Sequence, residues 1–96
     1  MLSNEDRKRH EHLMEKGEIV EFVVQYEILI ENKWMPVVRY DTAHGYTHKD
    51  LINPDGSKEK IFIGPADFND ALTLADKDIN ENWERYKDRF IKRRKR

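Results

Sequence analysis

The chain has 96 residues, of which 39% are charged and 38% are hydrophobic, and its formal net charge is −1. This length predicts one domain over residues 1–96, with a small core that would gain from a partner such as a second copy. The absence of cysteine excludes disulfides, thiolate metal sites and a cysteine nucleophile. The longest apolar run is far shorter than a membrane span and no signal peptide is recognised, so a cytoplasmic protein without membrane contact is expected.

The first part of the chain, SNEDRKRHEHLMEKG, is polar and rich in charge. Ser3 can cap a helix, Asp6 follows three residues later, and Gly17 can end the helix. A short N-terminal helix within residues 1–17 is therefore predicted, with a thin apolar face and a tendency to fray.

From Glu18 to Glu31 the apolar pattern has a period of two, which predicts a half-buried antiparallel strand with its even positions facing the core. The composition of the next segments predicts three further strands and tight turns between them. These elements together predict a four-stranded antiparallel meander. The three further strands are expected at residues 34–41, 46–52 and 58–63, and the turns at residues 32–33, 42–45 and 53–56.

After Asp67, apolar residues recur every three or four positions, which is the spacing of one helix face. Asp67 is a good N-cap, and Asp70 adds favourable charge in the first turn. A helix over residues 68–91 would be about 36 Å long, against about 27 Å for an eight-residue strand, so part of it would extend beyond the sheet and could pack against a second copy. The predicted fold is α+β, a meander packed by this long C-terminal helix. The apolar stripe consists of Phe68, Leu72, Ala75, Ile79, Trp83, Tyr86 and Phe90.

The net charge conceals a basic tail on an acidic body. Residues 92–96, KRRKR, carry five positive charges, so residues 1–91 carry a formal charge of −6. A basic tail can contact nucleic acid, but Lys and Arg also stabilise a helix C-terminus, where they oppose its partial negative charge. Both interpretations stay open.

Polar residues concentrate in the stretch VVRYDTAHGYTHKD. With the predicted turn lengths, His48 lies opposite Arg39 across neighbouring strands, on the face that the helix covers. Asp41 and Asp50 emerge on the same face. Charges on a covered face must be paired or take part in function. A slip of one residue in either turn would move some of these side chains to the solvent-exposed face.

The chain resembles small prokaryotic proteins of unknown function that share an RYD…HG…H signature. The resemblance lies in a strand that ends in RYD, a turn that contains glycine, and a following strand that carries a histidine. More distantly, residues 18–52 are similar to the TumE family of toxin components of toxin–antitoxin pairs. The resemblance implies that Arg39, Asp41 and His48 are the most important candidate site residues, and that a cognate antitoxin protein is a partner. Where the toxin pattern has a second histidine, this chain has Asp50.

A cluster of arginine, histidine and aspartate can cleave RNA without a metal ion or other cofactor. His48 would act as general acid or base and Arg39 would hold the phosphate. Asp41 or Asp50 would orient the imidazole. The alternative is a non-enzymatic protein-binding or homodimeric module in which the same cluster is structural.

Three further residues are candidate binding residues: Tyr26, which the predicted register places opposite Arg39, and His44 and Tyr46 near the following turn. A metal site made by His44, His48 and Asp50 is disfavoured, because histidines four residues apart suit a helix and these span a turn and a strand. No metal or cofactor is therefore expected. The expected partners are RNA, an antitoxin protein and a second copy of the chain.

Overall fold

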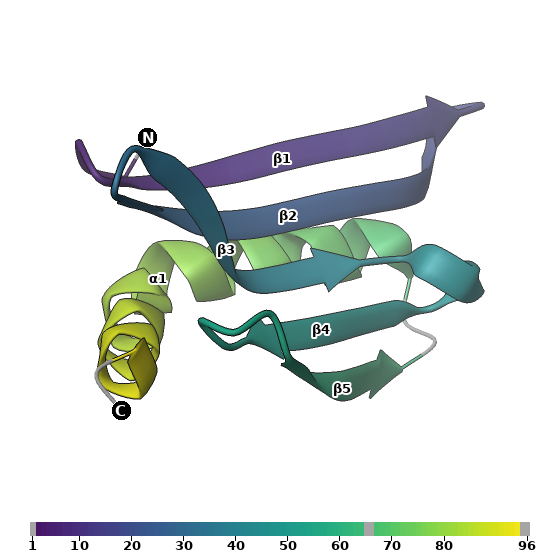
Figure 1. Ribbon diagram of the computed structural model, residues 1–96. Coiled ribbons are helices and arrows are strands. Elements are labelled where there is room, and N and C mark those ends of the chain that lie inside the picture. Colours follow the sequence, from purple (N-terminus) through teal and green to yellow (C-terminus); the bar gives the residue numbers. More distant parts are fainter. Residues whose placement is uncertain (1, 65–66, 95–96) are drawn as a thin grey trace.

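The computed structural model describes residues 2–64 and 67–94 and has an α+β fold (Figure 1). Each strand of its single sheet pairs antiparallel with the next along the chain. No helix within those residues is long and apolar enough to cross a membrane. The elements are β1 (Asp6–Glu15), β2 (Glu18–Ile30), β3 (Lys33–Asp41), the short 3-10 helix η1 (Ala43–Gly45), β4 (Thr47–Ile52), β5 (Lys58–Gly64) and α1 (Phe68–Arg94).

The antiparallel meander and the long C-terminal helix are confirmed, but the sheet has five strands instead of four. The predicted N-terminal helix is wrong, since residues 6–15 form β1, which pairs with β2. Gly17, which was expected to end a helix, instead closes a two-residue hairpin turn with Lys16. Their φ values of 80 and 52 give this turn the backbone twist that matches paired strands.

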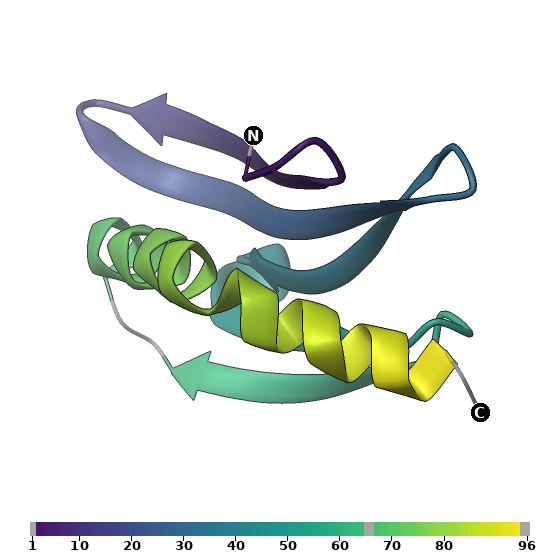
Figure 2. The same ribbon diagram turned by 90° about the vertical axis from the view of Figure 1, so that its left-hand side faces the viewer.

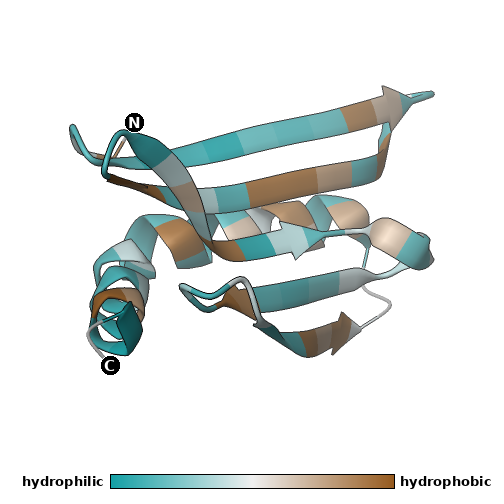
Figure 3. Ribbon diagram, in the orientation of Figure 1, coloured by the Kyte–Doolittle hydropathy of each residue, from teal (hydrophilic) through white to brown (hydrophobic). Residues whose placement is uncertain are grey.

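The sheet curves around α1, as two views at right angles show. β1 and β2 lie on one side of the helix and β5 lies on the other (Figures 1 and 2). The core fills the space between α1 and the inner face of the sheet, which is the face toward the helix. β1 is almost wholly hydrophilic (Figure 3). Asp67 caps α1 as predicted, because its Oδ1 accepts a hydrogen bond from the backbone N–H of Asn69 at 2.7 Å. The predicted stripe supplies the buried residues Leu72, Ala75, Ile79, Tyr86 and Phe90.

Asp6, at the start of β1, joins β1 to β2 and α1. Its side chain is buried, and it accepts hydrogen bonds from Ser3 Oγ (2.5 Å), Tyr26 Oη (2.5 Å) and Lys87 Nζ (3.1 Å). Burial acts to raise the pKa of Asp6, but these hydrogen bonds and the Lys87 charge outweigh it and lower the pKa. Burial and the bond to Asp6 together raise the pKa of Tyr26.

Asp78 makes the corresponding link from α1 to β3 and β4. It accepts hydrogen bonds from Tyr40 Oη (2.6 Å) and Tyr86 Oη (2.5 Å), and Lys49 Nζ lies 3.4 Å away. Burial opposes ionisation of Asp78, but the two tyrosine hydroxyls and Lys49 lower its pKa. Burial and the bonds to Asp78 raise the pKa values of Tyr40 and Tyr86.

The register between β2 and β3 differs from the prediction because of one turn and one bulge. The turn residues are Glu31 and Asn32, with φ values of 50 and 64, so the turn comes one residue earlier than predicted. A β-bulge then leaves Val37 without a partner in the ladder. The neighbouring Pro36 has no N–H to donate to the ladder, which favours an irregularity at this point.

As a result, Arg39 lies opposite Gln25, one position from its predicted partner. Its side chain therefore emerges on the outer face, defined here as the face of the sheet away from α1. The longer connection to β4 shifts the second register by two residues, so that Asp41 pairs with His48 and Arg39 with Asp50. An odd shift turns side chains to the other face and an even shift does not. The four predicted catalytic residues therefore share one face, but not the helix-facing side that was predicted.

Candidate functional site

Asp41, the last residue of β3, links Arg39 to His48 on the outer face. Arg39 Nε lies 2.9 Å from Asp41 Oδ2, and His48 Nε2 lies 2.6 Å from Asp41 Oδ1. The backbone N–H of Ala43 also donates to Asp41 Oδ1, at 3.2 Å. Both carboxylate oxygens are thus engaged, and the buried Asp41 lies between the arginine and the imidazole.

The imidazole of His48 is closed to solvent, with 2% of the residue exposed. The ring of Tyr46 packs against it at a centroid distance of 5.6 Å, and against Phe62 at 5.4 Å. Phe62 is also the ladder partner of His48 in β5. A general acid or base must come within hydrogen-bond distance of its substrate, and this packing keeps the imidazole of His48 out of reach.

An open groove of about 610 Å³ lies beside this cluster. It is bounded by the β1–β2 hairpin and by the connection from β3 to β4, and Arg39 and Asp41 form part of its wall whereas His48 does not. Two of its aliphatic residues, Leu13 and Val20, are exposed. The groove is lined by Glu11, His12, Leu13, Val20, Glu21, Phe22, Val23, Arg39, Asp41, Thr42, Ala43, His44 and Gly45.

The connection from β3 to β4 is held against β2 and shapes one end of the groove. Thr42 Oγ1 accepts a hydrogen bond from the backbone N–H of Phe22 at 3.0 Å. His44 has a φ of 68, a left-handed conformation that costs most non-glycine residues energy. The exposed His44 therefore sits at the groove in a conformation that this tie helps to fix.

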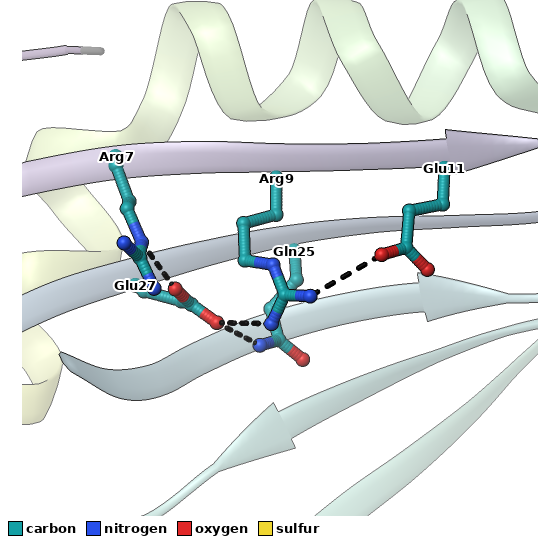
Figure 4. A network of polar contacts seen from close by, with 5 residues as sticks. All are labelled: Arg7, Arg9, Glu11, Gln25 and Glu27. Carbon is teal, nitrogen blue, oxygen red and sulfur yellow. Dashed lines mark hydrogen bonds and ion pairs between the residues drawn. The ribbon is translucent and has the colours of Figure 1, made fainter.

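A second polar network occupies the outer face of β1 and β2 (Figure 4). The buried Glu27 lies at its centre and receives Arg7 Nε at 2.5 Å, Arg9 at 3.4 Å and the side-chain amide of Gln25. Arg9 also pairs with Glu11 at 3.2 Å. A cavity of about 140 Å³ is lined by residues of both this network and the Arg39 cluster, which places the two side by side.

The structure gathers some of the predicted site residues and separates others. Arg39, Asp41, His48 and Asp50 lie together on neighbouring positions of β3 and β4. Tyr26 is not part of this group, because it is buried on the inner face with its ring 6.0 Å from that of Trp83. Tyr46 packs on His48, and His44 lines the groove.

Sequence reasoning missed the groove, because it placed residues 1–17 in a helix. Leu13 and Glu11 reach the groove only because β1 extends the sheet. The signal that could have revealed β1 is the Lys16–Gly17 pair between two segments of strand length. A glycine in the second position of a two-residue loop supplies the positive φ that a type I′ hairpin turn requires.

The family described as a domain of unknown function, DUF7718, matches the chain over residues 1–96, and the chain belongs to this family. No curated protein matches the chain, and neither does any solved structure. The family description assigns no activity, so the function must be argued from the groove and the cluster beside it.

Proposed function

We propose that this protein is a non-enzymatic protein-binding module whose groove takes a segment of a partner protein. The observation that carries the proposal is the burial of His48, which is 2% exposed and does not line the groove. A ribonuclease of the predicted kind needs this imidazole beside its substrate. Its burial favours a structural role in which His48 and Arg39 are both held by Asp41.

The groove has the composition of a site for a peptide with aliphatic and basic side chains. Leu13 and Val20 are 47% and 38% exposed and offer apolar anchoring points. Glu11 and Glu21 add negative charge, which attracts a Lys or Arg of the partner and repels the phosphates of RNA. Arg39, held by Asp41, can donate hydrogen bonds to a carbonyl or carboxylate of the bound segment. An antitoxin protein is a partner that fits this chemistry and the resemblance to toxin components.

A display library of random twelve-residue peptides tests this proposal. Selection on the purified protein should enrich peptides that combine an aliphatic or aromatic residue with Lys or Arg. Leu13→Gln should weaken binding of a selected peptide about tenfold, since truncating an anchor in an interface costs more than about 1 kcal/mol. Leu74→Gln is the matched control, because Leu74 is similarly exposed, at 51%, but lies on α1 outside the groove.

Enrichment of acidic peptides, or equal loss of binding in the Leu13 and Leu74 variants, would contradict the proposal. Circular dichroism should show the same spectrum and the same melting temperature for both variants within a few degrees. The substituted side chains are exposed, and exposed substitutions usually change stability by less than about 0.5 kcal/mol.

A metal-independent ribonuclease acting as a toxin component is a second candidate. It is favoured by Arg39, whose side chain is 43% exposed at the groove while Asp41 fixes its position. This hypothesis predicts that His48→Ala abolishes RNA cleavage or cell toxicity without changing the fold. If the cluster is only structural, the same variant should lower the melting temperature and have no cleavage activity to lose.

A further inference from the structure

We infer that Asp41, His48 and Asp50 form a binding site for a divalent transition-metal ion. One ring nitrogen of His48 and one oxygen from each carboxylate lie within 4.8 Å of one another. All three residues are buried, and they come from adjacent positions of β3 and β4 on the outer face. The inference does not depend on the groove binding a peptide.

Asp50 is the residue that points to a ligand. It is 3% exposed, and its Oδ1 has no hydrogen-bond donor in the described part of the chain. No Lys, Arg or His of residues 2–64 and 67–94 lies within 4.0 Å of its carboxylate oxygens. His48 Nδ1, on the same face, is also buried without a hydrogen-bond partner among the described residues. Buried carboxylates are normally paired with a cation or bound to a metal ion.

The neighbouring charges do not supply the missing cation. Arg39, the ladder partner of Asp50 in β3, forms its ion pair with Asp41 instead. Lys60, the ladder partner in β5, is exposed and makes no ion pair among the described residues. Asp41, Asp50 and Arg39 together carry a formal charge of −1, which favours a cation between the two carboxylates.

The ligand set selects the class of ion. An imidazole nitrogen suits Zn²⁺ and related transition metals, whereas Mg²⁺ and Ca²⁺ prefer oxygen ligands only. Around an ion bound at about 2.1 Å, tetrahedral ligand atoms lie about 3.4 Å apart. The separations are 2.6 Å between Asp41 Oδ1 and His48 Nε2 and at most 4.8 Å within the set, so the ligand atoms would have to shift by about 1 Å to reach that value. Arg39 can keep its contact with Asp41 Oδ2 and hold this ligand from the outer shell.

Calorimetric titration with Zn²⁺, Mn²⁺ and Mg²⁺ tests the site. The titration should use the His10→Ala, His12→Ala double variant, because these exposed imidazoles lie 3.1 Å apart and could bind Zn²⁺ by themselves. We expect one Zn²⁺ per chain, bound at least about tenfold more tightly than Mg²⁺. Bound Zn²⁺ should also raise the melting temperature, since it binds only the folded chain.

Adding Asp50→Asn to the double variant should weaken Zn²⁺ binding by at least about tenfold and remove the rise in melting temperature. The matched control is Asp70→Asn, which changes an exposed carboxylate in the first turn of α1 and should leave Zn²⁺ binding unchanged. Absence of binding at millimolar Zn²⁺, or equal binding with and without Asp50, would overturn the inference. If Asp50→Asn does not fold, His48→Gln takes its place, and binding that survives in this folded variant refutes the site.

Discussion

Replacing Asp78 with alanine should destabilise the fold more than any exposed charge substitution on α1. Its carboxylate receives Tyr40 Oη at 2.6 Å and Tyr86 Oη at 2.5 Å, and it neutralises Lys49, whose Nζ lies 3.4 Å away. Only 18% of the Asp78 side chain is exposed, so solvent cannot replace these contacts fully. Removing one partner from a buried charged network costs about 3–5 kcal/mol.

The free energy of unfolding should be measured by urea denaturation, followed by circular dichroism. For a domain of this size a loss of 3–5 kcal/mol lowers the melting temperature by at least about 12 °C. Asp76→Ala is the matched control, since Asp76 lies two residues earlier, is 41% exposed and pairs with Lys8 near the surface. That variant should lose about 0–1 kcal/mol. If both variants lose the same amount, Asp78 does not join the helix to the sheet in the way described.

Three further predictions concern pH, the first hairpin and assembly. Asp6 and Asp78 have lowered pKa values, so their ionised forms stabilise the fold above the unfolded-state pKa near 3.8. This stabilisation should be lost as pH falls through the folded-state pKa values, and melting temperatures measured at a series of pH values would show the loss. The tyrosines that donate to them have raised pKa values, so stability should also fall as pH rises above about 10, where unfolded tyrosine ionises. Gly17→Ala should cost about 1–2 kcal/mol in urea denaturation because φ is 80, and a loss near zero would show that the β1–β2 turn rearranges freely. A homodimer with contacts from α1 stays a prediction. Light scattering that gives the mass of a monomer at high micromolar concentration would contradict it.

The parts of the fold that sequence predicted are those whose apolar pattern decides the structure. The alternation from Glu18 to Ile30 places most of the even-numbered apolar residues of β2 in the core, and the three-and-four spacing after Asp67 places one face of α1 there. Both patterns can be recognised from the local sequence alone, without knowledge of which distant segments pack against them. β1 has no such pattern, because most of it is exposed and its stability comes from pairing with β2 and from the bonds of Asp6 and Glu27.

The register could not be predicted, because it depends on backbone details that side-chain patterns do not reveal. The turn lies at Glu31 and Asn32 instead of at the predicted residues 32–33, and Pro36 lies beside a bulge that adds one residue to β3. These two changes moved Arg39 by an odd number of positions and so to the other face of the sheet. The connection after β3 added an even shift, which kept Arg39 and His48 together.

The accessibility of these two residues follows from their neighbours on that face. Arg39 lies beside Gln25 and next to the groove, so its guanidinium stays partly exposed. His48 lies beside Phe62 and under the ring of Tyr46, so its imidazole is buried although no helix covers it. The same two residue types could serve cleavage if both reached the groove. Because only the arginine does, the site is better suited to hold a ligand than to transfer a proton to it.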